Sequence, residues 1–212
     1  MLNPLDKLIL SKIYVHNLLS ENFDGERLED ILVLNKDLLD ERVLELKKLG
    51  FIESSYSDNG NKLTFLGRDA IKVVLVGGVF DVLHPGHIYT LKAAKSYGDV
   101  LVVVIATTQT ALKIKKERKI YHDENLRKEL VSSLKFVDVS IIGKEGTLFD
   151  TVEVVRPDII ALGYDQSHNE KEIALNCEKR NLNVRVVRLN TPIPGSKSSQ
   201  IKIELGDQLY GI

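Results

Sequence analysis

The sequence has no tryptophan, a single methionine, a single cysteine (Cys177) and only 6% aromatic residues among its 212 positions. One cysteine excludes an internal disulfide and suits a reducing compartment. No apolar run approaches the length of a membrane span, and the first residues lack the layout of a signal peptide. Positive and negative charges nearly balance, with a net charge of −1. The chain as a whole therefore has no electrostatic attraction to nucleic acid or to an anionic membrane. We therefore expect a cytoplasmic protein that does not bind membranes.

What remains is ordinary globular composition, with 43% hydrophobic and 28% charged residues. Residues 1–70 differ in pattern from the rest. Apolar residues recur at helical spacing, Gly50 would stop a helix, and the turn residues 57–61 separate two short β-prone runs. The expected elements are helices over 4–19, 28–34 and 36–49 and strands over 51–56 and 62–65. This order predicts a small winged-helix domain over residues 1–70.

The charge of this first domain argues against DNA binding. Residues 1–70 contain nine Lys and Arg against thirteen Asp and Glu, a net charge of −4. A module that reads a DNA groove is normally basic, because carboxylates that face phosphates weaken binding. We therefore expect a docking, dimerising or lid role for this domain, and DNA is an unlikely partner.

From Ile71 onward, short continuous apolar runs alternate with helical stretches. This alternation predicts an α/β domain over residues 71–212, with a Rossmann-like, doubly wound parallel sheet of five strands. In such sheets ligands bind beyond the carboxyl ends of the strands. The expected strands are 72–76, 99–106, 137–142, 158–162 and 184–189, and the expected helices are 85–96, 123–135, 147–155, 169–180 and 198–208.

The run Gly77-Gly78-Val79-Phe80-Asp81-Val82-Leu83-His84-Pro85-Gly86-His87 is the most informative part of the chain. It lies where the first of these strands hands over to a helix, and Pro85 suits the first turn of that helix. Backbone amides and the helix dipole favour a phosphate at such a place, and His84 and His87 would share one face there. A metal site is not expected, since no third ligand accompanies the two histidines.

The spacing resembles the HxGH nucleotidyltransferase superfamily, the cytidylyltransferase-like enzymes. Gly78, Phe80, Asp81, His84, Gly86 and His87 match its motif, and Val79 stands where threonine is usual. The resemblance implies that residues of this loop bind the nucleotide and that His84 and His87 are catalytic. The implied binding residues are Gly78, Val79, Phe80, Asp81, His84 and His87. Asp81 could instead have a purely structural role.

Three later stretches extend the resemblance. Residues 125–138 resemble the family helix that carries a basic catalytic residue, here Arg127. Residues 157–166 resemble the segment beside the nucleotide base and ribose, which implies binding by Gly163 and Asp165. Residues 194–201 resemble the motif that opens the last helix, which implies phosphate binding by Lys197, Ser198 and Ser199, with simple helix capping as the alternative. The arginine of that motif is absent, since Pro192 aligns with it.

Residues 113–119 hold five cations in seven positions. This run either closes over the triphosphate, with Lys115 as a catalytic cation, or forms a solvated face.

The sequence Ala-Leu-Gly-Tyr-Asp-Gln at residues 161–166 resembles the corresponding segment of the archaeal FAD synthases within the superfamily. The resemblance implies transfer of a nucleotide from ATP to FMN, with magnesium on the triphosphate. The alternatives are cytidylyl or adenylyl transfer to glycerol 3-phosphate or a heptose phosphate, with CTP in place of ATP, or a nucleotide-sensing DNA-binding regulator. A homodimer is compatible with all of these.

Overall fold

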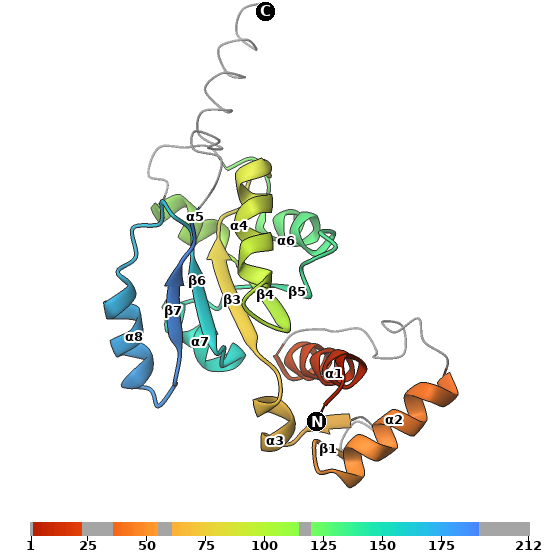
Figure 1. Ribbon diagram of the computed structural model, residues 1–212. Helices are drawn as coiled ribbons and strands as arrows, with labels where there is room; N and C mark the ends of the chain where they lie inside the picture. The colour runs from red at the N-terminus through yellow and green to blue at the C-terminus, as the bar shows by residue number, and fades with distance from the viewer. Residues whose placement is uncertain (1, 23–35, 55–60, 115–119, 191–212) are drawn as a thin grey trace, which may run out of the picture. The chain divides into compact units, whose positions relative to one another are not determined.

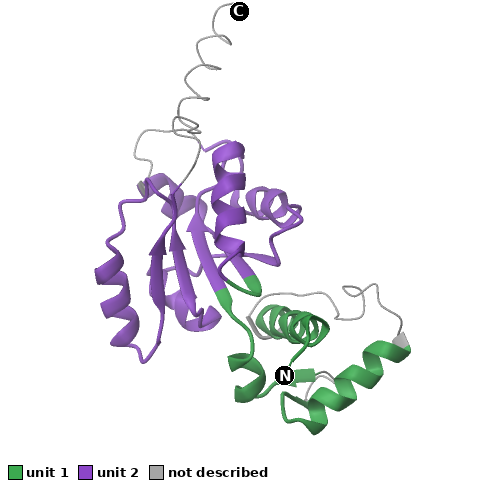
Figure 2. Ribbon diagram, viewed as in Figure 1, with its two compact units in different colours: residues 1–73, 98–100 green, residues 74–97, 101–212 purple. Residues whose placement is uncertain are grey.

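The computed structural model describes residues 2–22, 36–54, 61–114 and 120–190. The chain divides into two compact units, residues 1–73 with 98–100 and residues 74–97 with 101–212 (Figure 2). The expected helix over 28–34, most of the turn at 57–61 and the expected helix over 198–208 lie outside the described residues. Within the described residues, no helix combines the length and the apolar character needed to cross a membrane.

The first unit contains three described helices and a two-stranded antiparallel sheet. Its elements are α1 (Pro4–Asn22), α2 (Lys36–Lys48), β1 (Ile52–Ser54), β2 (Asn61–Leu63) and α3 (Phe65–Asp69). Buried apolar residues of α1, among them Ile9, Leu10 and Ile13, form much of its interior together with Leu46 of α2. The expected strand over 62–65 is wrong at its end. The Thr64 hydroxyl accepts a hydrogen bond from the Gly67 amide at 3.1 Å, so Thr64 caps a helix.

The second unit is built on a five-stranded parallel sheet with the order β5-β4-β3-β6-β7 (Figure 1). This sheet confirms the predicted Rossmann-like α/β fold. β3, β4 and β6 are continuously apolar and almost wholly buried, as expected of central parallel strands, whereas the edge strand β7 begins and ends on arginine. The strands are β3 (Val73–Gly78), β4 (Val100–Ile105), β5 (Val139–Ile142), β6 (Ile159–Leu162) and β7 (Arg185–Arg188).

Helices connect these strands. Among them, α6 packs against β5 and α8 packs against β7. The core joins residues of the strands, such as Val103 and Ile105, to Leu91 of α4 and Val131 of α6. A helix that the sequence did not predict, α5, follows β4. The helices are α4 (Pro85–Lys95), α5 (Thr108–Ile114), α6 (Glu124–Ser132), α7 (Leu148–Val155) and α8 (Glu170–Glu178).

Candidate active site

The loop between β3 and α4 places two imidazoles side by side. His84 is the N-cap of α4, Pro85 is in the first turn, and the His87 amide donates to the His84 carbonyl at 2.9 Å. The two rings stack with their centroids 3.9 Å apart and their planes at 29°. The Nδ1 atom of each ring is buried. The pair therefore lies at a helix N-terminus, where amides and dipole favour an anion.

Phe80 and Gly78 give this loop its shape. Phe80 has a left-handed backbone with a φ of 51°, which a bulky residue rarely adopts, and its side chain is buried. Its ring lies 5.2 Å from that of His87. A Cβ on Gly78 would come within 2.6 Å of the Phe80 ring, so only glycine fits there. Gly78 thus leaves room for the Phe80 ring, which packs against His87, and strain of the kind seen at Phe80 is typical of functional loops.

Asp81 ties the loop to the segment before α6. Its carboxylate is 1% exposed and accepts hydrogen bonds from the amides of Tyr121 and His122, each at 3.0 Å. The His122 ring returns the contact, with Nδ1 2.9 Å from the Asp81 carbonyl oxygen. Of the two roles the sequence left open for Asp81, this geometry favours the structural one.

Arg127 lies at the centre of three loops. Its side chain is 0% exposed, Nε donates to the His122 carbonyl at 2.9 Å, and Nη1 donates to the carbonyls of Val79 at 2.7 Å and Ala106 at 2.9 Å. Burial lowers the pKa of the guanidinium, while the Glu124 carboxylate, 3.9 Å away, raises it. The guanidinium to which the resemblance assigned a catalytic role therefore donates hydrogen bonds to backbone carbonyls.

Glu124 belongs to the same cluster. The Thr108 hydroxyl of α5 donates to its carboxylate, and this bond lowers the pKa of Glu124. Arg127 Nη2 lies 3.5 Å from the same hydroxyl oxygen. The cluster joins the loop after β4 to the start of α6.

The loop after β6 comes to the same edge of the sheet, because β6 pairs directly with β3. Gly163 is buried, and the side chain of Asp165 is exposed. The Gln166 side chain joins the two loops, since its Nε2 donates to the Gly77 carbonyl at 2.8 Å. The loop that contains Gly163 and Asp165 is thus bonded to the histidine loop's strand through Gln166.

Four predicted site residues, Lys115, Lys197, Ser198 and Ser199, lie outside the described residues. Three residues that the sequence reasoning passed over hold the site together: His122, Gln166 and Arg188. Arg188, at the end of β7, donates to the carbonyls of Gly163, Gln166 and His168. Gln166 ends the stretch 157–166 that the sequence analysis singled out, whereas no motif marks His122 or Arg188.

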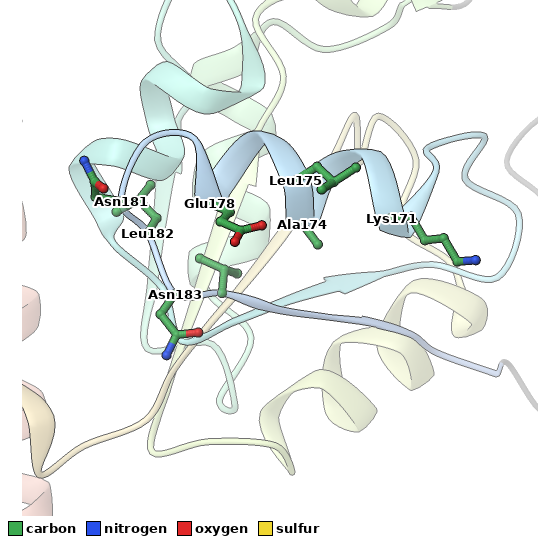
Figure 3. Close-up of a pocket in the computed structure, with 8 residues that line it drawn as sticks. Lys171, Ala174, Leu175, Glu178, Asn181, Leu182 and Asn183 are labelled. Atoms are coloured by element: carbon green, nitrogen blue, oxygen red, sulfur yellow. The ribbon is translucent and has the colours of Figure 1, made fainter.

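A separate groove lies along α8 and the segment that leads into β7 (Figure 3). Leu175 and Glu178 line it from α8, and Asn181 and Asn183 line it from that segment. Because residues 181–184 precede β7, they lie at the amino end of the strand, whereas the histidine loop follows the carboxyl end of β3. The groove contains none of the predicted site residues.

The parallel sheet and the paired histidines after its first strand define a protein of the nucleotidyltransferase class. The chain belongs to the cytidylyltransferase-like family, whose sequence pattern matches residues 75–204. This match begins within β3 and includes both loops described above.

The similar proteins agree with this assignment. The chain is 44% identical over 142 residues to an FAD synthase of Aciduliprofundum boonei, a match that covers 65% of this chain and 94% of that protein. It is 50% identical over 117 residues to an FAD synthase of Picrophilus torridus, covering 55% and 83%. A crystal structure of a lipopolysaccharide core biosynthesis protein from Thermoplasma volcanium GSS1 superposes with a TM-score of 0.55 at 44% identity, covering 58% of this chain and 99% of that one.

Proposed function

We propose that this protein is an FMN adenylyltransferase, which makes FAD and pyrophosphate from FMN and ATP. A phosphate oxygen of FMN attacks the α-phosphorus of ATP, the bond from that phosphorus to the oxygen bridging to the β-phosphate breaks, and pyrophosphate leaves with that oxygen. The observation that carries the proposal is the stacked His84–His87 pair at the start of α4, in a chain 44% identical to an FAD synthase along nearly all of that protein.

The protein has little covalent chemistry to perform in such a reaction, so positioning and charge stabilisation supply the rate. His84 and His87 donate hydrogen bonds to the phosphates as negative charge builds on the α-phosphate and the leaving oxygen. The amides of Gly78, Val79 and Phe80 line the phosphate site. Gly163 and Asp165 hold the base and ribose.

Cations and hydroxyls from the undescribed segments complete the site in this proposal. Lys115 closes on the pyrophosphate, and Lys197, Ser198 and Ser199 contact phosphate. Arg127 acts through the backbone of the loops and does not touch substrate, because its side chain is buried and its Nε and Nη1 are bonded to backbone carbonyls.

Magnesium enters the reaction on ATP, as part of the substrate. Within the described part of the chain, no three His, Cys, Asp or Glu side chains cluster in a way that could hold a metal ion. Asp81, the carboxylate of the phosphate loop, accepts backbone amides instead. Mg²⁺ commonly binds through substrate phosphates and water with few protein ligands, so the proposed reaction does not require a metal site built by the protein.

Residues 1–70 form a winged-helix domain in this proposal, with a docking, dimerising or lid role. Its order of two helices around residues 23–35 followed by a two-stranded sheet supports the assignment. Its net charge of −4 weighs against DNA as its partner.

One assay tests the proposed reaction. The protein is incubated with Mg²⁺ and either ATP or CTP, against FMN, glycerol 3-phosphate or a heptose phosphate, and pyrophosphate is measured. We expect release with ATP and FMN, accompanied by FAD. Release only with CTP and a polyol phosphate would overturn the flavin assignment. No release from any pair would favour the regulator, which a gel shift at low salt then tests.

A further inference from the structure

The two binding loops leave the sheet at the point where its winding changes direction. In the order β5-β4-β3-β6-β7, the chain proceeds from β3 to one side through β4 and β5, and then to the other side through β6 and β7. Neighbouring strands β3 and β6 pair at Val74–Ile159 and Leu75–Ile160. Connections that depart to opposite faces leave a crevice between their loops, and ligands bind there.

Gln166 connects the two loops at this point. Its Oε1 accepts a hydrogen bond from the Gly163 amide at 3.1 Å, and its Nε2 donates to the Gly77 carbonyl at 2.8 Å. One end of the amide therefore holds the loop after β6, and the other end holds the end of β3. Such a bridge needs a donor and an acceptor on one side chain, which only Gln and Asn provide as a neutral planar amide.

Arg188 fixes the loop after β6 from its other side. Its guanidinium donates to the carbonyls of Gly163 at 3.0 Å, Gln166 at 2.9 Å and His168 at 2.7 Å. Its Nε also pairs with the Glu170 carboxylate at 2.6 Å. Arg188 thus holds the loop to β7, and Gln166 links the same loop to the end of β3.

We propose that Gln166 is a positioning residue that sets the spacing between the Gly163–Asp165 loop and the histidine loop, so that one ATP molecule fits both. This inference rests on the proposed function, in which the Gly163–Asp165 loop holds the nucleoside and the histidine loop holds the phosphates. Reacting groups must be placed within a fraction of an ångström, so a small change in this spacing misplaces the α-phosphorus. A ligand that touches only one loop does not depend on the spacing.

The test compares whole and divided ligands. Binding of ATP, adenosine and inorganic pyrophosphate is measured for the full chain carrying Gln166→Ala. We expect ATP affinity to fall about tenfold, which equals ~1.4 kcal/mol and is the size of one net hydrogen bond. Adenosine and pyrophosphate should each bind within about twofold of wild type, because the gain from linking two binding halves depends on their geometry.

A second variant separates bridging from local loop support. Gln166→Glu keeps the acceptor for the Gly163 amide but places a carboxylate oxygen against the Gly77 carbonyl. We expect it to lose ATP affinity at least as strongly as Gln166→Ala, while adenosine, which has no phosphate charge, is unaffected. Arg185→Ala, at the exposed opposite end of β7, is the control and should bind all three ligands normally.

Three outcomes would overturn the proposal: ATP affinity within twofold of wild type in Gln166→Ala, equal losses for adenosine and ATP, or normal ATP binding by Gln166→Glu. If Gln166→Ala fails to fold, Gln166→Glu decides alone, because it preserves size and the Gly163 contact. These binding measurements need no turnover. Failure of the wild type to make FAD would therefore refute the proposed reaction, whereas the role of Gln166 is decided by the binding measurements alone.

Discussion

Replacing Arg127 by alanine should destabilise the protein strongly, because its guanidinium holds three loops from a fully buried position. The carbonyls of Val79, Ala106 and His122 would each lose a charged donor. Hydrogen bonds to charged groups contribute about 1.5–3 kcal/mol each, and such contributions are not additive. Breaking a buried charged cluster typically costs 3–5 kcal/mol, so a loss of about 4 kcal/mol is expected.

Thermal unfolding measures this loss. One kcal/mol shifts the Tm of a domain of this size by roughly 2–4 °C, so Arg127→Ala should lower the Tm by about 10 °C. Arg127→Lys should also lower it, because a single ammonium cannot reach carbonyls on several sides. Lys135→Ala removes the same charge from an exposed position near the end of α6 and should change the Tm by less than about 2 °C.

Activity measured beside stability decides between the two roles for Arg127. If the residue acts through the loops, Arg127→Ala loses stability and turnover together. A variant that melts within about 3 °C of wild type and yet loses most of its turnover would refute this reasoning. It would show that the guanidinium contacts substrate, as the sequence alone implied.

Three further predictions concern the site, the units and pH. His84→Ala and His87→Ala should each lower turnover by about 10²–10³-fold with the Tm retained, and turnover within a few-fold of wild type would remove that histidine from the mechanism. A chain that starts at Ala70 should still bind ATP by calorimetry, and lost affinity in a folded truncation would place residues of the first unit in the site. Because the Thr108 hydroxyl lowers the pKa of Glu124 below its usual 4.5, the stability that Glu124 contributes is present above that value and lost as pH falls through the lowered pKa. Acid unfolding curves should therefore show a smaller loss of stability for Glu124→Gln than for wild type, and identical acid sensitivity would contradict the assignment.

The parallel sheet could be predicted from sequence because its signal is local and repeated. The three central strands are short continuous apolar runs, as at Val100–Ile105, because they are buried on both faces. The position of the histidine loop followed from the same signal, since it comes directly after one of these runs. The rule that loops at the carboxyl ends of parallel strands meet at one edge also pointed to the segment of Gly163, but the pairing of β3 with β6 and the Gln166 bridge to Gly77 came only from the structure.

Two short helices escaped this reasoning for physical reasons. The helix α3 begins at Phe65, whose side chain is 90% exposed, so burial does not direct it. The largely apolar residues 63–66 have the pattern of a strand, and the hydrogen bond of the Thr64 cap favours a helix there instead. The helix α5 is seven residues long and runs into a basic segment, which gives it too few turns for a periodic pattern.

The roles of polar residues were hardest to predict, because a sequence shows which donors exist and not which acceptors they meet. The motif resemblance implied a catalytic role for Arg127 and nucleotide binding for Asp81, yet each side chain is buried and bonded to backbone groups of a neighbouring loop. Backbone amides and carbonyls leave no trace in the sequence, so their partners can be identified only in the structure. In the proposed reaction this loop holds two imidazoles against highly charged phosphates, and such internal bonds help to fix its shape. Under the proposed function the polar residues therefore divide into two groups: His84 and His87, which face the ligand, and Asp81 and Arg127, which hold the loop in place.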